Sequence, residues 1–215
     1  MRILETSFLN GLLLLAMFFC YNFPQLKTTK PFKMNLKYYL LSLFCFFLVA
    51  NISAQESKLN ILVFSKTVGY KHKAIPVGIE FLTTMASKNH WNIAFSTDVN
   101  DFTVDNLLKY NTLVFLNTTG NLFDADQKQA LKTYMASGRG FIGIHAASDT
   151  EKEWDWYGEM IGAVFSSHPK IQKATVTVDK SISHPATNEL KAIESFTDEW
   201  YNFKKPVGKH VTVFG

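Results

Sequence analysis

His145 is the residue of this sequence best suited to chemistry, because it ends an apolar segment and begins a tight turn. Gly140–Ile144 contains only glycine, phenylalanine and isoleucine, and His145 is followed by two alanines. An imidazole at such a point can act as a general base, a general acid or a metal ligand. The alternative is a neutral histidine bonded to nearby backbone, so the position is a candidate whose role the pattern leaves open.

Further polar residues are candidates, each with a structural alternative. Asp149 falls in the first turn of a predicted helix, where the helix dipole stabilises an acid whatever its function. His168 and His184 each precede a proline, which favours extended backbone and is typical of loops. Asp198–Tyr201 sets two carboxylates beside two aromatic rings, a composition suited to holding a sugar, but also typical of a surface strand.

The elements that must position these residues alternate between short apolar segments and amphipathic ones, which predicts repeated βαβ units and an α/β fold with a mostly parallel sheet. Asp124 with Gln127, and Ser148 with Glu151, have the spacing of helix capping boxes. Strands are predicted at 59–64, 91–96, 112–116, 140–145, 174–178 and 211–214, and helices at 76–88, 103–110, 124–138 and from 148 onward.

In a doubly wound sheet the ligand crevice lies beyond the carboxyl ends of the strands. The loops expected there are 65–75, 117–123 and 145–148. Tyr70 and His72 lie in the first loop, Asn117 opens the second, and His145 opens the third. The pattern therefore predicts a polar site where these three loops converge, at the tip of a central strand.

Composition and charge exclude several classes of function. A length of 215 residues with 47% hydrophobic content fits one domain with a sizeable core. Residues 1–54 hold five of the 22 basic residues and one of the 18 acidic residues, so residues 55–215 contain 17 of each and are formally neutral. A neutral domain has no electrostatic attraction for phosphate backbones, so nucleic acid is not an expected partner.

Both cysteines, Cys20 and Cys45, precede residue 55. The rest of the chain therefore has no disulfide, no thiolate nucleophile and no cysteine-ligated zinc. Any nucleophile or metal ligand in that part must come from histidine, carboxylate, hydroxyl or lysine side chains.

Residues 34–54 have the order of a secretory signal peptide: Lys37 in a basic start, an apolar core at 39–50, and small residues before a cleavage site after Ala54. The core is shorter than the roughly 20 residues that span a bilayer, although an uncleaved membrane anchor is the alternative. Residues 1–33 are interpreted as an upstream extension with Met34 as the true start, or as part of a membrane hairpin. The sequence thus predicts a protein exported to the periplasm or beyond the cell, with no stable membrane anchor after cleavage.

Several motifs in one order resemble the ThuA-like (trehalose utilisation) family from about Leu59 to the end. They are Gly69–His72, Gly138–His145, Trp154 with Tyr157, Gly162–Phe165, His168-Pro169, His184-Pro185 and Asp198–Tyr201. The resemblance implies a single-domain, flavodoxin-like fold of the class I glutamine amidotransferase-like type, over residues 55–215. It also implies sugar utilisation and a polar pocket formed by His72, His145, His168 and Glu199.

Two departures limit what the resemblance implies. True amidotransferases of this fold have a cysteine where this chain has His145, so glutamine hydrolysis through a thioester is excluded. Family members usually continue with a further glycine-rich strand after the point at which this chain stops, at Gly215. We therefore expect the sequence to be truncated at its carboxyl terminus.

The leading hypothesis is an enzyme acting on a disaccharide or keto-sugar by acid–base chemistry, and its type (hydrolase, lyase or isomerase) stays open. The alternatives are a non-catalytic sugar-binding module and a metal-dependent hydrolase that uses His72, His145 and His168 with a carboxylate. A divalent metal has weak support, since these residues lack the close spacing of helix-borne zinc motifs. The predicted catalytic residues are His145, Glu199, Asp149 and His168, and the predicted substrate-binding residues are His72, Tyr70, Asn117, Trp154 and Tyr201.

Overall fold

The computed structural model describes residues 58–214. The predicted upstream extension at 1–33 and signal peptide at 34–54 lie outside the described residues, so their interpretation stays a prediction. Within 58–214, no helix is both long enough and apolar enough to cross a membrane.

The described chain is built on a parallel sheet of four strands in the order β2-β1-β3-β4. Its strands are β1 (Asn60–Phe64), β2 (Asn92–Ser96), β3 (Thr112–Leu116) and β4 (Gly140–Ile144). Each lies within one residue of its predicted segment, because short apolar runs bounded by polar turns fix a strand's position well. Neighbouring strands pair in simple parallel register, for example Val63 with Val114 and Val114 with Ile142.

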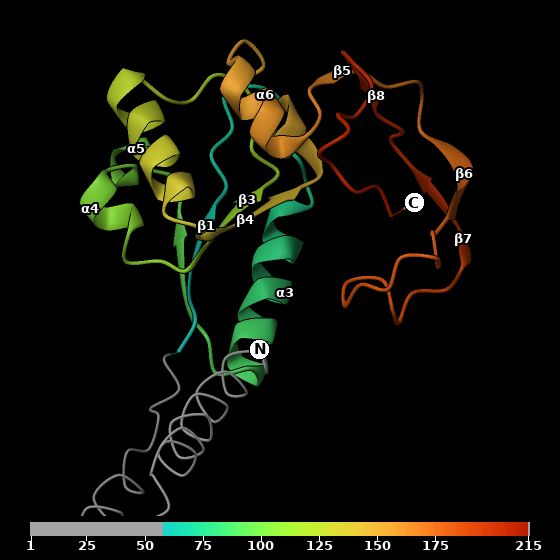
Figure 1. Cartoon of the computed structure of the whole chain (residues 1–215), viewed down its shortest axis with the longest axis horizontal. Coiled ribbons are helices and arrows are strands. Elements are labelled where there is room, and N and C mark those ends of the chain that lie inside the picture. Colours follow the sequence, from blue (N-terminus) through green and yellow to red (C-terminus); the bar gives the residue numbers. More distant parts are fainter. Residues whose placement is uncertain (1–57, 215) are drawn as a thin grey trace, which may run out of the picture. The chain divides into compact units, whose positions relative to one another are not determined.

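Helices cover both faces of this sheet, which confirms the doubly wound α/β prediction (Figure 1). Along β1 and β3 successive side chains point to opposite faces, as strand geometry requires. Ile61 and Val63 pack with Ile79 and Leu82 of α3 (Ile75–Lys88). Residues of opposite parity pack with the helices of the other face, α4 (Val104–Leu107), α5 (Ala125–Ala136) and α6 (Asp155–Ile161).

The predicted helix starts at 103 and 124 are confirmed by their caps. Thr103 accepts a hydrogen bond on its side chain from the backbone of Asn106 at the start of α4. Asp124 and Gln127 form the complete reciprocal capping box that begins α5. Both caps satisfy backbone N–H groups that have no partner inside the helix, which is why the residue types alone locate them.

The last third of the described chain forms two small antiparallel pairs beside the main sheet (Figure 1). β5 (Phe165–Ser167) pairs with β8 (Asn202–Phe203), and β6 (Gln172–Thr177) pairs with β7 (Ile193–Asp198). The chain leaving β7 passes through Glu199 and Tyr201 on its way to β8, so this region delivers the predicted acidic and aromatic residues.

Two of the elements predicted from the sequence are wrong. Ser148 and Glu151 do not cap a helix: residues His145–Asp149 form the 3₁₀ helix η2, and α6 begins only at Asp155. The carboxylate of Glu151 accepts hydrogen bonds from a different loop instead, so it is not available to its own helix start. Residues 211–214 form no strand, and there Phe214 instead accepts a hydrogen bond from the backbone N–H of Asp179.

The position of β4 also differs from the expectation of a central strand. Among residues 58–214, β4 pairs only with β3 and therefore lies at the edge of the described sheet. Ile142 is accordingly exposed despite its apolar side chain. His145 thus directly follows an edge strand and is the first residue of η2.

Glu151 is the buried charge that ties the loops of the sheet together. Its side chain is 1% exposed and pairs with the ammonium group of Lys128 on α5 at 2.8 Å. Its Oε1 accepts hydrogen bonds from the backbone N–H groups of Leu122 and Phe123, in the loop between β3 and α5. One carboxylate therefore joins the segment after η2, the loop after β3 and the first turns of α5.

We expect Glu151→Ala to lower the free energy of unfolding by about 3 kcal/mol, because it leaves two backbone N–H groups without their acceptor. Urea unfolding followed by circular dichroism measures this loss. The matched control is Glu153→Ala, which removes the exposed partner of Lys204 and should cost about 0–1 kcal/mol. Equal losses in the two variants would contradict the role assigned to Glu151.

Candidate active site

The three predicted loops converge at the carboxyl ends of β1, β3 and β4. The backbone of Val68, after β1, donates to Thr119 O at 2.9 Å. Gly120 in turn donates to the carbonyl of Asp149 at 3.1 Å and accepts from the N–H of Glu151 at 3.1 Å. These bonds hold loop to loop, so the prediction that the loops meet at one edge is confirmed.

His145 occupies a backbone conformation that few side chains adopt. Its φ is 47°, in the left-handed region, immediately after β4 ends. Asn117 follows β3 in the same way with a φ of 53°, and its N–H donates to Ile144 O at 3.2 Å. Left-handed backbone at residues other than glycine costs free energy and is concentrated at functional sites.

The side chain of His145 contacts two polar groups from the segment between β7 and β8. Its Nε2 lies 3.1 Å from the hydroxyl of Tyr201 and 3.4 Å from Oε2 of Glu199. One ring nitrogen is therefore within reach of both a hydroxyl donor and a carboxylate. The imidazole is 29% exposed, so a ligand can reach it.

His72 completes the centre of the group from the first loop. Its ring packs edge-on against His145 with centroids 4.5 Å apart, and Tyr70 packs edge-on against His72 at 4.8 Å. One ligand atom each of His72, His145 and Glu199 lie within 4.8 Å of one another. We call these three residues the central triad.

His168 and Asp149 lie at the margin of the triad. His168 places Nε2 4.0 Å from Oε2 of Glu199, and its Nδ1 lies 2.8 Å from Pro169 O. Asp149 instead pairs with Lys152 at 2.6 Å, so its charge is already compensated by a residue that the sequence did not single out.

The electrostatics of the site favour a neutral imidazole and a protonated phenol. Burial, and then the neighbouring His145, lower the pKa of His72 below its ordinary 6.5, so the ring is neutral at pH 7. Burial, and then the charge of Glu199, raise the pKa of Tyr201. Tyr201 therefore keeps its proton at neutral pH and can donate a hydrogen bond.

A cavity of about 610 Å³ opens beside the triad. His72, His145 and Glu199 line it together with Asn117 and Asp198. The structure thus brings Asn117 to the same space as the triad, as predicted. Asp198 also reaches it, although the sequence placed no emphasis on Asp198 beyond its motif.

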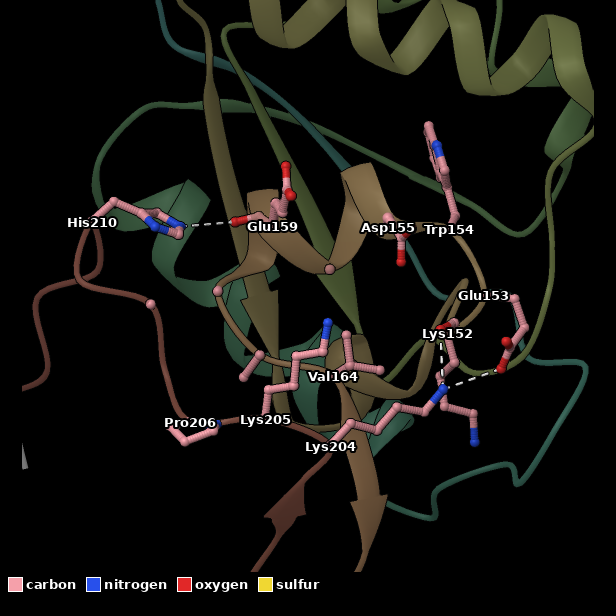
Figure 2. Close-up of a pocket in the computed structure, with 14 residues that line it drawn as sticks. Lys152, Glu153, Trp154, Asp155, Glu159, Val164, Lys204, Lys205, Pro206 and His210 are labelled. Carbon is pink, nitrogen blue, oxygen red and sulfur yellow. Dashed lines mark hydrogen bonds and ion pairs between the residues drawn. The ribbon is translucent and has the colours of Figure 1, made fainter.

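Trp154 lines a different cavity of about 440 Å³, between α6 and the segment after β8 (Figure 2). There the ammonium group of Lys204 contacts Glu153 at 3.2 Å, and His210 contacts the carbonyl of Glu159 at 3.3 Å. These polar groups of the second cavity are paired with one another or with backbone. Trp154 itself packs beneath Lys128 and Lys132, and its predicted role in binding substrate stays a prediction.

The central triad suits a divalent metal ion by its chemistry. Two imidazoles and one carboxylate are ordinary ligands of zinc, and a fourth position open to water is typical of catalytic sites. Zinc binds such atoms at about 2.0–2.2 Å, so the donors need only a small movement to converge on one ion. Of the histidines predicted as ligands, His72 and His145 belong to this set and His168 stands outside it, with Glu199 supplying the carboxylate.

Sequence reasoning missed Phe165, whose ring lies 4.3 Å from that of Tyr201 and supports it from β5. Phe165 belongs to one of the motifs that carried the family resemblance, but nothing in its type marked it as part of the site. Only the pairing of β5 with β8 brings it there.

Comparison with known proteins shows to which family the chain belongs. The family model for ThuA, described as trehalose utilisation, matches residues 60–214. The chain belongs to the ThuA family. A crystal structure of a ThuA-like protein from Bacteroides uniformis matches with a TM-score of 0.61 and 25% sequence identity.

That match covers 72% of this ThuA-family chain and 64% of the Bacteroides chain, so the sequence spans less than two thirds of the other protein's length. No curated protein matches the chain. The family and its flavodoxin-like fold are thus established, which confirms the resemblance drawn from the motifs.

The left-handed backbone of His145 predicts that this position is strained by any side chain, and glycine substitution tests this. We expect His145→Gly to unfold with a free energy about 1 kcal/mol higher than His145→Ala, because glycine adopts this conformation without steric cost. The same pair at His72, whose φ is not positive, should show alanine as the more stable residue. Urea unfolding of the four variants decides this, and the same order at both positions would argue against strain at His145.

Proposed function

We propose that this ThuA-family protein acts on a disaccharide or keto-sugar by acid–base chemistry at His145 and Glu199. One observation carries the proposal: Nε2 of His145 lies 3.1 Å from the Tyr201 hydroxyl and 3.4 Å from the Glu199 carboxylate. A base beside both a proton donor and a carboxylate is the arrangement that proton transfer next to a carbonyl requires.

The roles follow from the charges. His145 takes the proton from the carbon beside the sugar carbonyl and becomes an imidazolium ion. Glu199 stabilises that positive charge at 3.4 Å. When substrate is bound, the Tyr201 hydroxyl donates its hydrogen bond to the oxygen on which negative charge develops, and not to Nε2 of His145, so that this nitrogen can take the proton. This first step is common to isomerisation and to elimination, so the proposal covers both reaction types.

The residues that surround the central triad can support the reaction by positioning its groups or by contacting the sugar. His168 faces the same Glu199 carboxylate, and Asp149 is held by Lys152 near the loop that carries His145. Asn117, Tyr70 and His72 supply polar and aromatic surface for the sugar. We further propose that the reaction takes place outside the cytoplasm, on the strength of the signal-peptide pattern at 34–54.

The test is turnover of disaccharides and their 3-keto forms by the purified protein, followed by chromatography of the products. Both His145→Ala and Glu199→Gln should lower the rate constant by on the order of 100-fold or more, the usual contribution of a positioned acid or base. His184→Ala is the control, since it removes a histidine that packs on Phe214 and does not belong to the central triad. Unchanged turnover in His145→Ala would remove His145 from the mechanism, and binding without turnover would favour a sugar-binding module.

A second candidate function is a metal-dependent hydrolase, favoured by the convergence of the central triad within 4.8 Å. A bound divalent ion would polarise a carbonyl or activate a water molecule. In that case His72, His145 and Glu199 hold the ion and are not free to transfer protons themselves.

Calorimetric titration with zinc separates the two candidates. If the second candidate holds, zinc binds the protein, Glu199→Gln weakens binding by at least roughly ten-fold, and chelation abolishes turnover. The His184→Ala variant should bind zinc like the unaltered protein. Turnover that persists after chelation would contradict the metal-dependent function.

A further inference from the structure

The 610 Å³ cavity beside the triad is lined in part by three apolar side chains that are exposed and do not belong to the core. Val77 and Phe81 stand one turn apart on α3, and Ile171 comes from the loop between β5 and β6. Their exposed fractions are 67%, 61% and 64%. We call these three residues the apolar wall.

The apolar wall is not a by-product of packing α3. The helix already buries its other face, since Ile79 and Leu82 pack against the sheet with Ile61 and Val63. Single exposed apolar side chains are ordinary on protein surfaces. Three of them, from two separate elements and lining the same cavity as a polar cluster, match the composition of a small-molecule site.

The lining of the cavity therefore contains both polar and apolar groups. Polar atoms that can bind sugar hydroxyls belong to Asn117, Asp198 and Glu199. The three side chains of the apolar wall offer no hydrogen-bonding group. A second sugar ring placed against them would lose hydrogen bonds to water without replacement, whereas a hydrocarbon group would gain by leaving water.

We propose that the site takes a glycoside whose aglycone is an apolar aryl or alkyl group, in preference to a disaccharide. The sugar binds the polar residues of the lining, and the aglycone packs on Val77, Phe81 and Ile171. A volume of about 610 Å³ fits a ligand of this size. This inference rests on the proposed function for the placement of the sugar, but its test does not depend on turnover.

The experiment is calorimetric binding of phenyl and methyl D-glucosides, each as both anomers, to the purified protein. At least one phenyl glucoside should bind roughly ten times more tightly than its methyl counterpart, because a partly buried ring contributes about that factor. Phe81→Gln should reduce this preference to about two-fold or less. The matched control is Ile193→Gln, which changes a residue of similar exposure, 62%, on β7, and it should leave the preference unchanged.

The outcomes separate this inference from the proposed function. Equal binding of phenyl and methyl glucosides, or no binding of any phenyl glucoside at millimolar concentration, overturns the apolar-aglycone assignment even if His145 proves essential for turnover. A phenyl preference that depends on Phe81 supports the assignment even if no keto-sugar is turned over. Sedimentation analysis adds a last check: a dimer that Phe81→Gln converts to a monomer would overturn the assignment, because a second copy would then cover the apolar wall.

Discussion

The geometry of the site depends on a buried carboxylate that does no chemistry. Parallel strands bring their carboxyl ends to one edge of a sheet, but they leave the loops beyond that edge undefined. Glu151 supplies the missing constraint, because its carboxylate accepts hydrogen bonds from the loop after β3 and pairs with Lys128 of α5. Its backbone adopts a φ of 50°, and its N–H donates to Gly120. The turn that begins at His145 is thereby fixed against the loop that begins at Asn117.

With the loops fixed, the site is assembled from three distant parts of the chain. His72 comes from the loop after β1, His145 from the end of β4, and Glu199 from the segment between β7 and β8. The strained backbone at His145 points its ring toward Tyr201 and Glu199. The antiparallel pairs β5–β8 and β6–β7 are small, but they deliver the acid and the phenol without which the two histidines would have no partners.

The chemical character of the site follows from these neighbours more than from the fold. This chain has His145 at the turn after β4 and no cysteine from residue 55 onward, so the site cannot use a thiolate. Burial keeps His72 neutral and Tyr201 protonated. The same cavity is lined by the central triad and by the exposed side chains of the apolar wall.

The sequence by itself located the four strands of the main sheet, the helix caps at 103 and 124, and the candidates Tyr70, His72, Asn117 and His145. Alternation of apolar and polar residues and helix capping both depend on residues close together in the chain, so a sequence pattern can show them. The motif Asp198–Tyr201 was identified through the family's pattern, and its composition alone did not distinguish a site from a surface strand. Only the tertiary structure decided that Glu151 would accept hydrogen bonds from the loop after β3 and not cap a helix. The same holds for the edge position of β4 and for the contacts of Glu199 and Tyr201 with His145. Each of these depends on contacts between residues far apart in the chain, whose free energies no local pattern records.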